Sequence, residues 1–129
     1  MKESIKRGDY GVSSEIFREE VEEANKKFSA VVFHVENAVF AFFTEGKEPR
    51  LGTLAVALPL RREGVAPALS SILLGDRNQT ITRILAERFV AVFNKIGLVS
   101  TFTETVEENV AGRIFMRLIE KISGKEKLK

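Results

Sequence analysis

The chain has 129 residues, of which 44% are hydrophobic and 29% are charged; this supports one hydrophobic core and is too short for two independent domains. It contains no cysteine and a single histidine, which excludes disulfides, thiolate nucleophiles and thiolate metal sites and leaves little for imidazole-based metal binding. The net charge is only +2, with acidic and basic residues interspersed. Such a pattern is typical of a solvated surface, whereas nucleic-acid binding requires basic residues clustered on one face.

No stretch approaches the roughly 18 to 20 uninterrupted apolar residues that cross a bilayer, and residues 1–10 are charged without an apolar signal region. We therefore expect a cytoplasmic protein with no membrane partner. Many Lys, Arg and Glu residues, with a single Gln and no Cys, also suit a heat-adapted organism.

The first segments of the chain carry the weakest pattern. Residues 1–13 combine charge with two glycines, and we expect a flexible lead-in there. Between residues 14 and 28 two interpretations remain open. The spacing of Phe17, Val21, Ala24 and Phe28 fits a helix, but the alternation of Phe17, Glu19 and Val21 fits a strand.

Two strands are predicted next, over residues 29–36 and 38–44, with a tight turn at Glu36 and Asn37. In the second strand both faces are apolar, because Val39 and Ala41 alternate with Phe40 and Phe42. A strand of this kind is central in its sheet or is covered on both sides. Phe40 and Phe42 are therefore candidate contacts with another subunit.

Further strands are predicted over residues 52–58, 68–74 and 98–104, with loops at 45–50 and 61–67. The short connections between the first four strands favour an antiparallel meander.

The segment from residue 81 to 96 predicts an amphipathic helix. Its main stripe consists of apolar residues at helical spacing, namely Ile81, Leu85, Phe89, Val92 and Ile96. Asp76, Asn78 and Thr80 are alternative N-caps, and Gly97 is expected to end the helix in the left-handed conformation.

A second apolar side of this helix consists of Ala86, Val90 and Phe93. A helix that is apolar on two sides is usually packed on both. In a chain this short we expect the second cover to be another subunit, so Ala86, Val90 and Phe93 join Phe40 and Phe42 as the candidate interface.

Thr105 and Glu108 have the capping-box spacing of a last helix, and the final apolar residue of this helix is Ile122. We expect a basic tail at residues 123–129 and a single domain at residues 14–122. The predicted fold class is α+β: an antiparallel sheet of five or six strands with two helices packed on it.

No set of residues predicts catalysis. His34 lies in a predicted strand next to Glu36, without an evident Ser or Cys partner, and is best explained as a half-exposed strand residue. Glu104, Glu107 and Glu108 favour a helix N-terminus, and Asp76 fits a turn or cap. We therefore assign no catalytic, cofactor-binding or metal-binding residue. The alternative is a small-ligand protein or enzyme that uses His34 and the nearby acidic residues.

Three stretches of the chain carry a family resemblance: residues 32–43 (VFHVENAVFAFF), 51–57 (LGTLAVA) and 70–89 (SSILLGDRNQTITRILAERF). In this order and spacing they resemble the small proteasome-assembly chaperones, namely the third and fourth members of the eukaryotic set and their archaeal relatives. The most specific part is the Leu-Leu-Gly-Asp turn at residues 73–76.

The resemblance covers roughly residues 29–122 and implies a non-enzymatic, dimeric α+β protein that acts without nucleotide or metal. It implies a strand near residues 15–21, and proteasome α-type subunits as partners. Some larger relatives end in a hydrophobic residue, a Tyr and a final residue that enter pockets of the α-ring, whereas this chain ends Lys127, Leu128, Lys129. A paralogous chaperone is therefore an alternative partner.

Overall fold

A computed structural model describes residues 16–59 and 69–127 of the chain. Strands and helices follow one another in an α+β arrangement: β1 (Ile16–Glu23), β2 (Lys26–Val35), β3 (Ala38–Glu45), β4 (Thr53–Leu58), β5 (Leu69–Leu74), α1 (Gln79–Phe93), β6 (Ile96–Phe102) and α2 (Glu108–Lys127). The lead-in expected at residues 1–13 and the loop expected at 61–67 lie outside the described residues.

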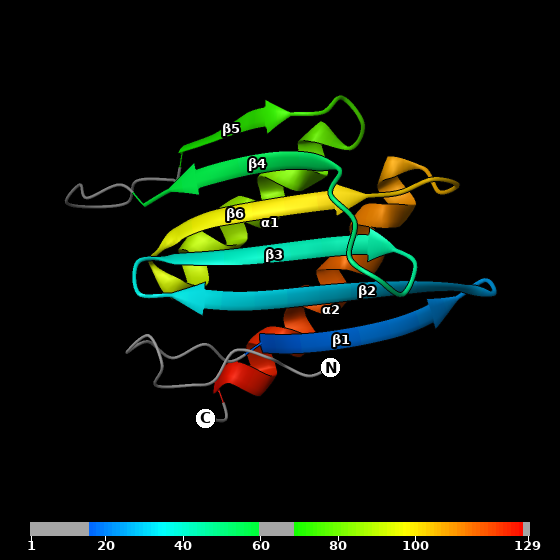
Figure 1. The fold of residues 1–129 in the computed structure, drawn as a ribbon, viewed down its shortest axis with the longest axis horizontal. Coiled ribbons are helices and arrows are strands. Elements are labelled where there is room, and N and C mark those ends of the chain that lie inside the picture. The colour runs from blue at the N-terminus through cyan, green and yellow to red at the C-terminus, as the bar shows by residue number, and fades with distance from the viewer. Residues whose placement is uncertain (1–15, 60–68, 128–129) are drawn as a thin grey trace.

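The six strands form one sheet in the order β1-β2-β3-β6-β4-β5 (Figure 1). This confirms the predicted fold class, with one difference in pairing. β6 lies between β3 and β4 and runs parallel to β3, so the sheet is mixed, and β2 to β5, the four strands expected to form a meander, are not continuous neighbours. The helix α1 between β5 and β6 supplies the long connection that places β6 in the middle of the sheet.

Both helices cover the same face of the sheet (Figure 1). Helix α1 packs on β4, β5 and β6, and α2 packs on β1 and β2. Between them they bury a core whose largest members are fully enclosed aromatic side chains, namely Phe28, Phe43, Phe89 and Phe115. One core therefore serves the whole described chain.

In the ambiguous segment, the described residues 16–28 form strand β1, a turn and the start of β2, as the family resemblance implied. β1 and β2 join through Ala24 and Asn25, whose φ angles are 52° and 65°. A two-residue turn with positive φ at both positions suits the right-handed twist of a hairpin. Phe17 and Val21 lie on the same side of β1, and the turn at Ala24 and Asn25 separates them from Phe28 in β2, which together produces the apparent helical spacing.

The Leu-Leu-Gly-Asp turn has a physical reason for its glycine. Gly75 adopts a φ of 96°, and a Cβ at this position would lie 2.6 Å from the Cα of Thr53 in the adjacent strand. No larger residue fits without moving the backbone. The turn leads into α1, which begins after Asn78, one of the three expected N-caps.

The end of α1 differs from the prediction. The helix stops at Phe93, and Asn94 takes the left-handed position with a φ of 56° while its backbone N–H donates to the Val90 carbonyl at 2.8 Å. Gly97, expected at this position, is instead inside β6. Its missing side chain allows close packing, since a Cβ there would lie 2.8 Å from the carbonyl oxygen of Ala86. Asparagine is the second residue that tolerates this conformation, which is why the prediction was off by one turn.

Helix α2 begins at Glu108, two residues later than the capping-box spacing predicted, and continues to Lys127, five residues beyond the expected domain end at Ile122. Thr105 and Glu108 do not form a capping box. The Thr105 backbone N–H donates to Glu45 Oε1 at 2.9 Å, and Glu108 Oε2 accepts from the backbone N–H of Ile81 at 2.9 Å. Glu108 thus caps the first turn of α1 rather than its own helix.

Candidate interaction surface

The face of the sheet opposite the helices is apolar and is not covered by a helix in the described parts of the chain (Figure 1). In β2, Phe28, Ala30 and Val32 enter the core, so the intervening residues Val31 and Phe33 point to the opposite side. Strand pairing carries this alternation across all six strands. We call this side the open face.

Side chains on the open face form rows that cross the strands. The central row contains residues paired with one another in register: Ile16, Phe33, Phe40, Leu98, Val56 and Ser71. The hairpin row lies nearer the β2–β3 turn and contains Val35, Ala38, Ile96, Leu58 and Leu69. The loop-side row lies on the other side of the central row and contains Arg18, Val31, Phe42, Ser100, Leu54 and Leu74.

Most large side chains in these rows retain contact with water. Ile16 and Leu69 are each 60% exposed, and Leu58 and Leu74 are each 45% exposed. In the middle of the face Phe33 and Phe40 stack on each other with ring centroids 5.0 Å apart, which shields them only from the side. Exposed apolar side chains gathered on one face make it a candidate interaction surface.

The segment between β3 and β4 crosses one end of the open face (Figure 1). Three buried hydroxyls of the sheet hold its backbone. Ser29 donates to the Gly46 carbonyl at 2.9 Å, the backbone N–H of Arg50 donates to Thr44 at 3.2 Å, and the backbone N–H of Gly52 donates to Ser100 at 2.9 Å. We call residues 46–52 the crossing loop. It covers Ser100 in the loop-side row and the sheet beyond that row, and leaves the large apolar side chains of the three rows partly exposed.

Charged side chains limit the open face along its β1 edge. Arg18, Glu20 and Glu22 are exposed and alternate with the core-facing residues of that strand. The Arg18 guanidinium donates to the Lys47 carbonyl at 2.8 Å, and so ties this edge to the crossing loop. At the same end, the Arg50 guanidinium lies 4.6 Å from the centre of the Phe102 ring. The apolar area is therefore bounded on two sides.

The residues proposed from sequence as an interface fall into two groups. Phe40 and Phe42 lie on the open face, in the central and loop-side rows. Ala86 is fully buried and Val90 is 8% exposed, both inside the core of the single chain, while Phe93 stacks on Phe89 with centroids 6.0 Å apart. The structure corrects the expectation for Ala86 and Val90, because Gly97 brings β6 close enough to α1 to bury that side of the helix.

The side chains considered for catalysis do not come together. His34 lies between aromatic rings, with the Phe93 ring centroid at 4.8 Å and the Phe17 centroid at 6.5 Å, and its Nδ1 is 3.3 Å from Lys95 Nζ. Glu108 caps α1, far along the chain from His34. Within residues 16–59 and 69–127, no group of three His, Asp or Glu side chains is arranged to hold a metal ion.

Glu45 organises the acidic segment before α2. Its carboxylate accepts the backbone N–H groups of Glu104 at 2.7 Å and Thr105 at 2.9 Å, and also the Thr105 hydroxyl. Burial raises the pKa of Glu45, but the hydrogen bonds from Thr105, Glu104 and Val106 outweigh burial and hold the pKa below its usual range. This carboxylate therefore has a structural role.

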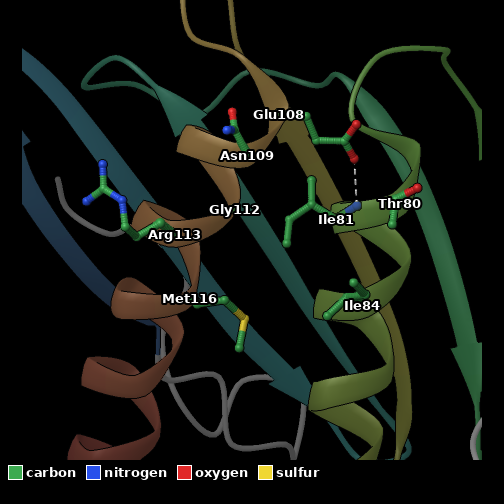
Figure 2. A pocket seen from close by; sticks show the side chains of 8 residues that line it. All are labelled: Thr80, Ile81, Ile84, Glu108, Asn109, Gly112, Arg113 and Met116. Atoms are coloured by element: carbon green, nitrogen blue, oxygen red, sulfur yellow. Dashed lines mark hydrogen bonds between the residues drawn. The ribbon is translucent and has the colours of Figure 1, made fainter.

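An open groove of about 650 Å³ lies between α1 and α2, on the side of the molecule away from the open face (Figure 2). Its wall on α1 contains Ile81 and Ile84, of which Ile84 is 45% exposed, and Gly112 and Met116 line it from α2. Figure 2 shows Glu108 reaching across one end to the backbone of Ile81.

The sequence identified part of the open face through β3, where apolar residues occupy both faces. It missed the contribution of β4 and β6, although Leu54, Val56 and Leu98 alternate with core residues in the same way. Their signal becomes clear only once the strand order places them next to Phe40 and Phe42.

Comparisons with known proteins agree with this fold. No protein-family model and no curated protein matches the sequence. Among solved structures, the fold is similar to a crystal structure of a novel chaperone complex for yeast 20S proteasome assembly, with a TM-score of 0.63 and 15% sequence identity over 88% of this chain and 96% of that chain. No helix among the described residues combines the length and apolar character needed to span a membrane.

Proposed function

We propose that this protein is a non-enzymatic assembly chaperone or scaffold related to the proteasome-assembly chaperones, and that it acts as an oligomer through protein surfaces. The observation that carries the proposal is the open face, a sheet side lined by apolar residues that no described helix covers. The fold similarity to a chaperone complex for yeast 20S proteasome assembly supports the same role.

The size of the open face supports self-association. With strands about 4.8 Å apart and alternate residues about 6.8 Å apart, six strands and three rows span roughly 29 by 20 Å before side-chain relief is counted. Stable interfaces bury about 800 Å² on each partner, a size that this flat area of roughly 580 Å² approaches once the relief of its side chains is added. A second copy of the chain provides an apolar surface of the same extent, so a contact between two copies removes the open face of each from water.

The client proposed for the assembled form is a proteasome α-type subunit, or alternatively a paralogous chaperone. Because self-association covers the open face, the assembled form presents its helix side to either partner, including the groove between α1 and α2. The chaperone function needs neither nucleotide nor metal.

Self-association is tested by light scattering over a concentration series. Phe40→Glu places a carboxylate in the middle of the open face and should convert the oligomer to a folded monomer, because an unpaired charge at an interface is costly. Ile84→Glu, which introduces the same charge at an exposed residue on the helix side, is the matched control and should leave the oligomer intact. A monomeric wild type at high concentration would contradict the proposal.

The client is tested by co-expression with proteasome α-type subunits and, separately, with a paralogous chaperone, followed by size-exclusion chromatography and native mass spectrometry. Co-elution of the wild type with either partner, lost in Phe40→Glu, supports a function of the assembled form. Failure to co-elute with both partners contradicts the proposed client.

A further inference from the structure

We propose that the outer edge of β5 is a docking site for an extended segment of a partner protein, which joins the sheet as an additional strand through backbone hydrogen bonds. The inference goes beyond the self-association proposed above and does not depend on it, because the groups that bind are backbone groups in the plane of the sheet. The partner segment carries aliphatic side chains on one side and hydroxyl side chains on the other.

The sheet has two outer edges, formed by β1 and β5 (Figure 1). An outer strand presents a row of unpaired backbone N–H and C=O groups. Proteins usually protect such a row with charged side chains, proline, a bulge or a covering segment. The two edges of this sheet differ in this protection.

β1 is heavily protected. It carries charged side chains on both sides of the strand, namely Arg18, Glu19, Glu20, Glu22 and Glu23. Glu23 pairs with Arg113 and Arg117 of α2. Glu19 lies 3.9 Å from Lys121 of the same helix, measured between Oε1 and Nζ. A strand added at β1 has to fit beside these ion pairs, so this edge is poorly suited to accept another chain.

β5 lacks the charges that protect β1. Its sequence, LSSILL, contains no charged residue and no proline. Leu69 is 60% exposed and Leu73 is 53% exposed. Among the described residues, no strand pairs with the outer side of β5. Exposed leucines beside an unpaired backbone favour a partner that removes both from water, and an extended chain with aliphatic side chains does so.

The regular part of β5 sets the length of the docking site. Its pairing with β4 is regular from Leu69 to Ile72, and a register shift follows at Leu54 and Ala55 of β4. Such a bulge disrupts strand pairing locally and is itself a form of edge protection. The docked segment therefore pairs with residues 69–72, and Leu73 adds an apolar contact beyond them.

The two sides of β5 define the side chains of the segment. Leu69 and Ser71 point to the open face, while Ser70 points to the helix side. There the Ser70 hydroxyl donates to Glu87 and accepts from Arg83 Nε at 3.0 Å. Side chains of adjacent strands lie about 5 Å apart on the same side of a sheet. Aliphatic residues of the segment therefore lie beside the leucines, and hydroxyl residues lie beside Ser70.

The β5 strand of a second copy uses this site less completely. Two β5 strands related by a two-fold axis run antiparallel, and paired residues point to the same side of the sheet. Leu69 then pairs with the second copy's Ser71, or Ser70 pairs with the second copy's Ile72. In either register one end of the regular stretch has no regular partner. An independent segment pairs along the whole stretch.

Binding is tested with a capped peptide, Val-Thr-Val-Thr-Val-Thr, that carries a fluorophore and is kept dilute while the protein is titrated. Fluorescence anisotropy measures the affinity. Two derivatives carry backbone N-methyl groups, either on every valine or on every threonine, and each lacks the donors along one edge of the extended peptide. We expect one derivative to bind like the parent and the other to bind about tenfold more weakly or worse. Equal affinities of both derivatives, or no binding of the parent, would overturn the proposal.

Two protein variants locate the bound peptide. Leu73→Lys gives β5 a protecting charge and removes an apolar contact, and should weaken binding of the parent peptide by roughly two- to fivefold. Ile84→Lys is the matched control, since Ile84 is 45% exposed and lies in the groove between α1 and α2. Its affinity should equal that of the wild type. Weaker binding by Ile84→Lys with no change in Leu73→Lys assigns the peptide to the groove and contradicts docking at β5.

Amide hydrogen exchange distinguishes the remaining occupants of the edge. The peptide should slow exchange at every second residue of the stretch 69–72 and leave β1 unchanged, because only alternate N–H groups point outward from a strand. If all amides of this stretch exchange slowly without peptide, another strand already covers the edge. Slow exchange at every protein concentration assigns that strand to the same chain, whereas slow exchange only at high concentration assigns it to a second copy. Either result overturns the proposal.

Discussion

The two faces of the sheet have nearly the same apolar character but opposite surroundings. On the helix side, Phe43 and Val99 are fully buried under α1 and α2. On the open face, their chain neighbours Phe42 and Leu98 remain partly exposed. The same strands therefore carry two apolar surfaces, of which residues 16–59 and 69–127 cover one with helices. Hydrophobicity alone does not distinguish a core from an interface; the position of the helices does.

The comparison is tested most strongly by placing the same charge on each side. Val90→Asp puts a carboxylate inside the core, at a residue 8% exposed, and should cost several kcal/mol, enough to unfold a domain of ordinary stability. Val35→Asp, at the hairpin row, should leave the monomer folded and weaken association. Near-ultraviolet circular dichroism and urea unfolding measure the first effect, and light scattering measures the second. A folded Val90→Asp variant would show that α1 can move away from β6.

Adjacent phenylalanines in β3 give a finer test. Phe43→Ala leaves a cavity beneath the helices and should lower the free energy of unfolding by about 3 to 5 kcal/mol. Phe42→Ala should cost roughly 1 kcal/mol in the monomer, since the side chain is partly exposed, and should affect self-association more. Urea unfolding at low protein concentration, where the monomer prevails, separates the two effects. Equal destabilisation by both changes would mean that the open face is covered within one chain.

Polar contacts on the helix side contribute less to the free energy of unfolding than the buried phenylalanines do. Glu108→Ala removes the carboxylate that accepts from the Ile81 N–H and should destabilise the fold by about 0.5 to 2 kcal/mol. Glu107→Ala removes a neighbouring charge near the same helix end without this contact and serves as the control. The difference between their urea midpoints isolates the cap of α1. If the two variants have the same urea midpoint, the hydrogen bond to Ile81 adds no stability, and the effect of each change comes from the loss of a negative charge near the helix ends.

The smallest expected effect is a pH dependence from Glu45. Its pKa in the folded chain is below its usual range, so its contribution to stability is fully present above the pKa of the unfolded chain, near about 4.3. That contribution is lost as the pH falls through the lower folded pKa. The difference in unfolding free energy between wild type and Glu45→Gln should therefore shrink on acidification. A difference that grows on acidification would contradict the assigned direction of the pKa shift.

Local patterns in the sequence predicted most of the elements because alternation and helical spacing are short-range signals. The strands at residues 29–36 and 38–44 and the helix beginning near Ile81 are all present, with small shifts at their ends. The parallel pairing of β3 with β6 was not predictable in this way. It depends on α1 carrying the chain across the sheet, a long-range event that short connections between earlier strands do not reveal.

The candidate interface was predicted in part for a related reason. Phe40 and Phe42 stand out because a strand with two apolar faces is visible within a few residues. Ala86 and Val90 show the limit of that reasoning. A helix needs a second apolar side when a neighbouring strand approaches closely, and the approach here depends on Gly97 in a strand that follows the helix. Sequence shows that the helix has two apolar sides, but not which part of the molecule meets each one.

The insertion of β6 between β3 and β4 also affects how the chain reaches its folded state. Before residues 96–102 are available, β1 to β3 and β4 to β5 form two separate antiparallel units, and the edges of β3 and β4 that will flank β6 are unpaired. Unpaired, apolar strand edges pair readily with other chains. Since sheet completion requires contacts between residues far apart in sequence, we expect slow folding for a domain of this size. A chain emerging from the ribosome thus carries two vulnerable edges until its C-terminal third has been synthesised.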